Sequence, residues 1–206
     1  MRGETLTVTL TRVEADGTRY VLIDDTETVE TVDVSVLPAF RPVVSTRDGD
    51  DALRAALQGR AQLDRRFSLA QVRGIPEVRS LAPAIEVAAV TFASGSAAIQ
   101  PDQAEALTDL AQEMLRAIGD DPREVFLIEG HTDAVGDAAY NLALSDRRAE
   151  TLALALNEYF QVPVENMVVQ GYGERFLKVQ TQTDERANRR AVARRITGLL
   201  QVAAAN

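Results

Sequence analysis

The sequence predicts an α+β protein in which two helices lie on one face of a mixed sheet, preceded by a small β-rich module. Apolar residues alternate with threonines near the start of the chain, which is the period-2 pattern of a half-buried strand. From residue 86 onward, short apolar runs typical of strands alternate with two long segments of helical periodicity. With 206 residues, 46% of them apolar, the chain is long enough to bury a substantial core.

Residues 1–85 predict a β-rich module and a connecting segment. The first strand contains Leu6, Val8 and Leu10, and Asp16-Gly17 supplies a tight hairpin turn to a return strand at 20–23. A third strand is expected at 31–36, before two prolines keep the chain extended.

A helical pattern then follows in the connecting segment. Leu53, Ala56 and Leu57 share one face of a helix that begins near Asp50, and Ser68 with Gln71 resembles a capping box. No residues of this half form a recognisable chemical site.

Residues 86–206 predict the order strand, helix, strand, helix, strand, strand. The expected strands are 87–92, 125–128, 167–169 and 192–199. The first helix opens with Pro101, continues to Ile118 and buries a stripe of apolar side chains that includes Leu110 and Leu115. The second helix stops before Pro163, and its expected core face consists of Leu142, Ala149, Leu152, Ala153 and Leu156.

Composition and charge exclude several functions. The chain has no cysteine, which removes disulfides, cysteine-based zinc sites and thiol nucleophiles. The net charge of −9 disfavours nucleic acid as the main partner, although five arginines gather in residues 186–195. Of the 22 basic residues only Lys178 is a lysine, and residues 86–206 carry 11 basic and 18 acidic residues.

The sequence contains no recognisable membrane or export segment. No apolar run is long enough to span a membrane, and the first residues are not those of a signal peptide, so we expect any export signal to lie upstream.

The candidate site lies in the second half of the chain. Asp133 follows the second predicted strand, and Asn141, Ser145 and Arg148 fall on one face of the next helix, which we expect to face outward toward the loop at 131–137. A guanidinium binds a carboxylate through two parallel hydrogen bonds, and an aspartate accepts from an ammonium. The two residues therefore match a zwitterionic amino-acid centre, and the alternative is a plain ion pair between Asp133 and Arg148.

These motifs identify a family resemblance. Gly130-His131-Thr132-Asp133 with Gly136, then Asn141 and 144–149, then Gly171-Tyr172-Gly173-Glu174 and Asn188-Arg189-Arg190 occur in order and on the expected elements. Together they resemble the OmpA-like C-terminal domain family, the peptidoglycan-binding modules of OmpA, Pal and MotB, over residues from about 90 to 199. The resemblance implies a division into an N-terminal module at 1–85 and an OmpA-like domain at 86–206.

The resemblance also implies roles for individual residues. Asp133 would take the ammonium and Arg148 the carboxylate of diaminopimelate in the peptidoglycan stem peptide. Asn141 would complete the pocket, Thr132 would shape the loop and Arg189 would line the rim. One position departs from the family: an acidic residue often follows Phe92, where this chain has Ala93.

The implied function is a non-catalytic cell-wall anchor without cofactor or metal, periplasmic and associated with the outer membrane or cell wall. It would bind diaminopimelate-type peptidoglycan and attach an outer membrane or an envelope complex to it, with any membrane attachment supplied by regions outside this chain. An interaction module is the main alternative, in which residues 1–85 recruit an envelope protein.

Two catalytic alternatives remain. Glu129, His131, Asp133 and Asp137 would serve a metal-dependent cell-wall hydrolase, although one imidazole is few for such a site. A Ser145-His131-Asp133 triad lacks a nucleophile elbow. His131 is better interpreted as a structural hydrogen-bonding residue of the loop.

Overall fold

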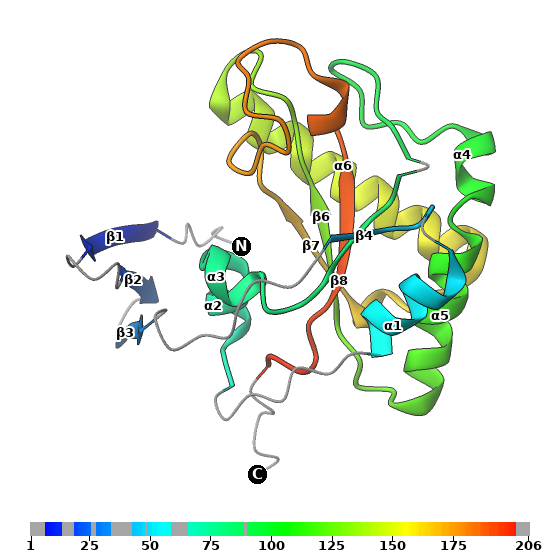
Figure 1. Cartoon of the computed structure of the whole chain (residues 1–206), viewed down its shortest axis with the longest axis horizontal. Helices are drawn as coiled ribbons and strands as arrows, with labels where there is room; N and C mark the ends of the chain where they lie inside the picture. Colours follow the sequence, from blue (N-terminus) through cyan, green and yellow to red (C-terminus); the bar gives the residue numbers. More distant parts are fainter. Residues whose placement is uncertain are drawn as a thin grey trace, which may run out of the picture. The chain divides into compact units, whose positions relative to one another are not determined.

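The computed structural model describes residues 7–13, 19–25, 28–33, 43–47, 49–58, 66–88 and 90–200 (Figure 1). They divide into two compact units, which fall within Met1–Arg41, Ala61–Ala82 and Gly198–Asn206 for the first and within Pro42–Arg60 and Pro83–Thr197 for the second. Strand β4 and helix α1 thus belong to the second unit although they precede residue 86. The predicted boundary at residue 86 stays a prediction. No helix among the described residues is long and apolar enough to cross a membrane.

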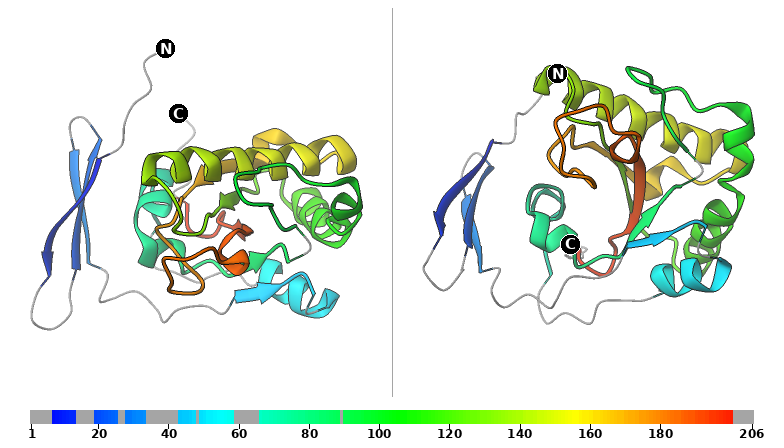
Figure 2. Two further views of the ribbon diagram at one scale, coloured as in Figure 1. Left: turned by 90° about the horizontal axis from the view of Figure 1, so that it is seen from above. Right: turned by 45° about the horizontal axis from the view of Figure 1, so that its top comes forward.

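The first unit contains a three-stranded antiparallel sheet and two short helices (Figure 2). Its elements are β1 (Thr7–Val13), β2 (Arg19–Asp25), β3 (Thr28–Asp33), α2 (Leu69–Gly74) and α3 (Pro76–Arg79). The first two predicted strands are confirmed, and the third, expected at 31–36, is observed as β3 at 28–33, with residues 34–36 of the prediction lying outside the described residues. The predicted Asp16-Gly17 turn lies outside the described residues, between two strands that pair antiparallel.

The capping box predicted at Ser68 is present. The Ser68 hydroxyl accepts the backbone N–H of Gln71 at 3.2 Å, and the Gln71 side chain accepts the backbone N–H of Ser68 at 2.9 Å. Two N–H groups that a helix start leaves unpaired are thereby satisfied.

Removing this cap should weaken the first unit slightly. We expect Ser68→Ala to lower the free energy of unfolding by about 1 kcal/mol, because the Gln71 N–H loses its acceptor. Urea unfolding followed by circular dichroism would measure the change, and Ser68→Thr, which keeps the hydroxyl, should retain most of the stability. A loss in Ser68→Thr as large as that in Ser68→Ala would contradict a role for the hydroxyl.

The second unit is built on a five-stranded mixed sheet in the order β4-β5-β8-β6-β7. Its strands are β4 (Val43–Ser45), β5 (Ala84–Glu86), β6 (Phe126–Gly130), β7 (Met167–Gly171) and β8 (Ala191–Arg195). Strand β8 runs antiparallel between β5 and β6, whereas β4 with β5 and β6 with β7 are parallel pairs. The predicted mixed sheet is therefore confirmed.

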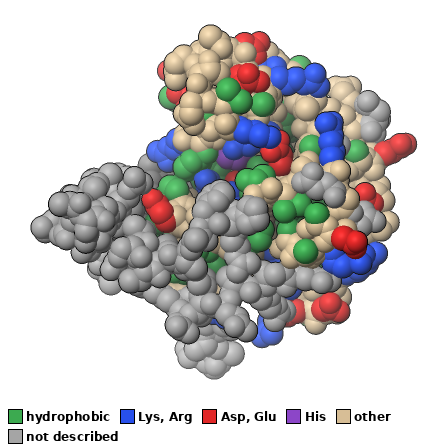
Figure 3. All heavy atoms as spheres, in the orientation of Figure 1, with side chains coloured by type: hydrophobic (Ala, Val, Ile, Leu, Met, Phe, Trp, Pro, Cys, Tyr) green, Lys and Arg blue, Asp and Glu red, His purple; other side chains and the backbone are tan. Residues whose placement is uncertain are grey.

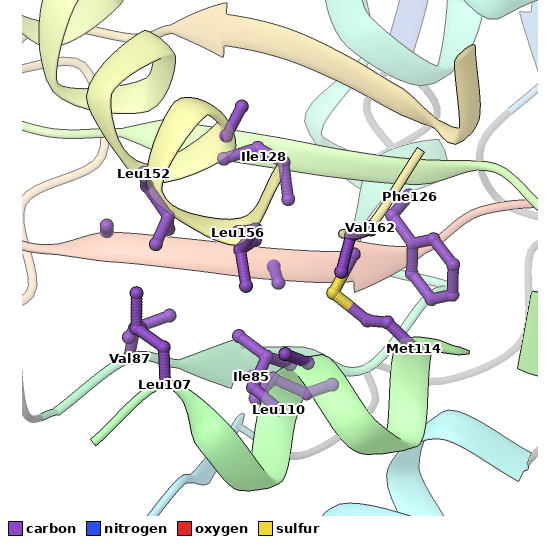
Figure 4. Close-up of a cluster of buried hydrophobic side chains, with 14 of the residues drawn as sticks. Ile85, Val87, Leu107, Leu110, Met114, Phe126, Ile128, Leu152, Leu156 and Val162 are labelled. Carbon is purple, nitrogen blue, oxygen red and sulfur yellow. The ribbon is translucent and has the colours of Figure 1, made fainter. Parts of the chain in front are cut away.

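Helices contribute most of the remaining core of this unit. They are α1 (Asp50–Gln58), α4 (Pro101–Glu105), α5 (Thr108–Asp120) and α6 (Ala138–Phe160), with short 3₁₀ helices η2 (Val164–Asn166) and η3 (Arg186–Asn188). Figure 4 shows apolar side chains of α5 and α6 meeting those of β6, among them Met114, Leu156 and Phe126. Because alternate residues of a strand face opposite sides, Phe126 and Ile128 reach this core together.

Four sequence predictions for this unit are wrong in detail. The strand expected at 192–199 ends at Arg195. The described residues of the predicted strand Val87–Phe92 form no strand: β5 ends at Glu86, and the chain then turns, with the N–H of Ala88 bonded to the Glu86 carbonyl at 2.9 Å. The expected single helix from Pro101 is interrupted at Ala106 and Leu107. Leu115 and Leu142 are 37% and 42% exposed rather than core residues.

Candidate functional site

The candidate site lies where β6 ends and α6 begins. Asp137 caps the helix, because its Oδ1 accepts the backbone N–H groups of Ala139 and Tyr140 at 2.9 and 3.0 Å. Gly130, the last residue of β6, allows close approach of the helix: a Cβ atom there would lie 1.9 Å from the carbonyl oxygen of Ser145. The segment 131–137 is therefore held between a strand end and a helix start.

Asp133 is nearly buried and is paired with Arg189. Its Oδ2 accepts the Arg189 Nη1–H at 2.8 Å, and its Oδ1 accepts the backbone N–H of Val135 at 3.3 Å. The same Arg189 nitrogen also contacts Asp184, and Arg189 Nε–H donates to the Phe92 carbonyl at 3.2 Å. Arg189 thus has two carboxylate neighbours, and the side chain of Asp133 keeps 9% of its surface exposed.

Arg148 is completely buried and is bonded to the backbone. Its Nε–H, Nη1–H and Nη2–H donate to the carbonyl oxygens of Ser96, His131 and Ala93 at 2.9, 2.8 and 3.2 Å. The guanidinium also lies over the ring of Phe92, 5.0 Å from its centroid. Loss of solvation lowers the pKa of Arg148 to about 10, against the attraction of Asp133, which raises it. The residue therefore stays charged at neutral pH and ties segment 93–96 to the loop.

Asn141 and Thr132 complete the surroundings of Asp133. Asn141 Nδ2–H donates to Glu174 Oε2 at 2.7 Å and to the Val135 carbonyl at 3.1 Å, which closes the loop onto the helix. Thr132 is 2% exposed, and its N–H donates to the Gly173 carbonyl at 3.0 Å. Its hydroxyl oxygen is buried without a hydrogen-bond partner among the described residues.

Two residues on α6 hold the segment after β7 in place. The Ser145 hydroxyl donates to the Leu142 carbonyl at 2.6 Å and accepts the Gly173 N–H at 2.8 Å, and Asp146 Oδ1 accepts the Gly171 N–H at 2.6 Å. Sequence reasoning gave these two residues no such role, and it also missed the contacts of Glu174 and Asp184 with the site. The signal available for Glu174 was its place in the motif 171–174.

The structure brings the five predicted residues Asp133, Arg148, Asn141, Thr132 and Arg189 into one region. The expected outward orientation of the helix face is wrong, because Asn141, Ser145 and Arg148 are 2%, 0% and 0% exposed. The bonded partner of Asp133 is Arg189 and not Arg148.

The carboxylates named for the metal alternative have other partners. Glu129 and His131 are buried together, with Oε2 and Nε2 3.3 Å apart, and Arg194 Nε–H donates to Glu129 Oε1 at 2.7 Å. Asp137 caps α6, and Asp133 pairs with Arg189. Within the described part of the chain, no three histidine, aspartate or glutamate side chains are placed to share a metal ion. His131 also stacks on Tyr172, with centroids 5.8 Å apart, as a structural residue of the loop.

Comparison with known proteins finds similarity over this region. The family model described as OmpA family matches residues 91–191. The outer-membrane lipoprotein YfiB of Pseudomonas aeruginosa is 38% identical over 84 residues, which are 41% of this chain and 47% of that protein. A YfiB lipoprotein of Escherichia coli is 38% identical over 71 residues, covering 34% of this chain and 44% of the relative. The chain thus spans about half the length of the curated relatives it matches.

A solved structure is similar over a comparable region. The peptidoglycan-associated lipoprotein from Burkholderia pseudomallei is 29% identical, with a TM-score of 0.44, over 52% of this chain and 86% of that chain.

Proposed function

Because residues 91–191 carry a domain of the OmpA family, we propose that this domain binds peptidoglycan non-covalently through the diaminopimelate residue of the stem peptide. Binding would anchor the outer membrane or an envelope complex to the cell wall. The name of the Pseudomonas relative, an outer-membrane lipoprotein, supports a place in the periplasm against that membrane. The proposal involves no catalysis and no cofactor.

The observation that carries this proposal is the polar cluster around Asp133. A nearly buried carboxylate, partly open to solvent, is flanked by the guanidinium of Arg189 and lies beside a loop tied to α6 by Asn141. Such a preorganised carboxylate binds an ammonium group more strongly than an exposed one does, because water competes less for it. Asp133 is therefore the proposed ammonium acceptor.

Arg148 is the proposed partner of the diaminopimelate carboxylate. In the free domain its guanidinium is bonded to the carbonyls of Ala93 and Ser96, so a ligand carboxylate reaches it when segment 93–96 releases those bonds. Arg189 lines the rim, and Thr132 and Asn141 shape the pocket. The proposal thus includes a local rearrangement of segment 93–96 on binding.

Co-sedimentation with purified sacculi tests this function. The chain should be retained by diaminopimelate-type sacculi at least about tenfold more strongly than by lysine-type sacculi, since lysine has the ammonium but lacks the carboxylate that Arg148 would bind. Equal retention by both walls would contradict recognition of diaminopimelate, and retention by neither would contradict wall binding. Release of muropeptides that a chelator abolishes would instead support the metal-dependent hydrolase.

A further inference from the structure

A pocket of about 680 Å³ lies within the second unit, beside the candidate site. Its walls come from the start of the unit, around β4 and β5, and from residues 178–190 after β7. The volume falls in the range of pockets that bind small molecules and short peptides. None of the roles assigned above to Asp133, Asn141 or Thr132 uses this pocket.

The walls of the pocket are basic in an acidic chain. Arg47, Lys178, Arg186, Arg189 and Arg190 line it against two acidic residues, whereas the whole chain has a net charge of −9. Figure 3 shows one face of the molecule, with Lys and Arg side chains interspersed among Asp and Glu side chains. Because a recess lined mainly by one sign of charge concentrates the field, this pocket attracts anions.

Arg47 and Arg186 differ from Lys178 and Arg189 in having no carboxylate partner within the described part of the chain. Lys178 is bonded to Glu86 at 2.7 Å, and Arg189 is shared by Asp133 and Asp184. By contrast, the Arg186 Nη2–H donates to the Thr91 hydroxyl at 3.1 Å, and Arg47 is exposed. Arg47 and Arg186 therefore keep the capacity to bind an anion through two parallel hydrogen bonds.

Arg189 connects the pocket to the candidate site, because it lines the pocket while bonding to Asp133. We propose that the pocket is a second subsite that binds the terminal carboxylate of the same peptide whose ammonium group lies at Asp133. This inference rests on the proposed function. A peptide carboxylate fits the mixed lining better than a doubly charged phosphate, because Glu86 and Glu185 also face the recess.

The test is a binding cycle by calorimetry with the full 206-residue chain. The probes are a synthetic stem peptide that contains diaminopimelate and ends in a free carboxylate, and the same peptide ending in a carboxamide. The wild type should bind the carboxylate form about three- to tenfold more tightly, as expected for two partly exposed charge pairs. In Arg47→Ala/Arg186→Ala this preference should disappear, which marks a direct coupling between the two arginines and that carboxylate.

The control is Arg147→Ala/Arg175→Ala, which removes the same charge from two exposed arginines outside the pocket and should keep the preference. Equal binding of both peptides by the wild type would overturn the second subsite while leaving the proposed function intact. Failure to bind either peptide would overturn both. A preference for the carboxylate form that persisted in Arg47→Ala/Arg186→Ala would also overturn the second subsite.

Discussion

Arg148→Ala should lower the free energy of unfolding by about 3–5 kcal/mol, one of the two largest effects that we expect from a single substitution in this chain. Hydrogen bonds to a charged donor each contribute about 1.5–3 kcal/mol, and Arg148 makes three of them to the carbonyls of Ala93, Ser96 and His131. Water can replace the donor at the first two, which lie in accessible residues, but less easily at the buried His131. The substitution also leaves a cavity beneath the ring of Phe92.

Urea unfolding followed by circular dichroism measures this loss, and Arg147→Ala is the matched control. Arg147 is the adjacent exposed arginine, so its removal should change stability by less than about 0.5 kcal/mol. Arg148→Lys should recover only part of the stability, because an ammonium lacks the planar fork that reaches three carbonyls. If Arg148→Ala were as stable as the wild type and lost only binding, Arg148 would act on the ligand alone, and its role in tying segment 93–96 would be wrong.

The fold could be predicted from the sequence where the spacing of apolar residues shows which side chains are buried. Strands β6 and β7 and the extent of α6 agree with the pattern, since each combines an apolar stripe with a clear start or stop. The error at Val87–Phe92 has a physical cause: Val87, Val90 and Phe92 are buried as expected, but burial alone does not require a strand. Leu142 was misplaced because a 23-residue helix such as α6 carries apolar residues on several faces.

The sequence could predict which residues form the site, but not which of their side chains bond to each other. Spacing placed Asn141, Ser145 and Arg148 together, and the structure confirms that they share a face. Spacing could not show that Arg189, 56 residues away along the chain, would take the carboxylate of Asp133. Nor could it show that backbone carbonyls, which are identical in every residue, would bind Arg148.

The second large effect concerns Asp133. Asp133→Asn should weaken binding of a diaminopimelate-containing stem peptide by at least about 30-fold, because truncating one partner of a desolvated charge pair typically costs about 2–5 kcal/mol. The amide keeps the size of the side chain, and Asp184 remains as a carboxylate neighbour of Arg189, so the site should stay folded. Isothermal titration calorimetry measures the affinity, and urea unfolding of the same variant checks that the fold is kept.

Asp137→Asn is the matched control for this variant, because it removes the same charge four residues away. Asparagine caps a helix about as well as aspartate, so α6 should be unaffected and the affinity should change little. Equal losses in the two variants would indicate a general effect of charge rather than a contact at Asp133. A peptide whose diaminopimelate amine is acetylated sharpens the distinction: it should bind the wild type as weakly as the unmodified peptide binds Asp133→Asn. If the two losses instead added when combined, Asp133 would not be the acceptor of the ammonium.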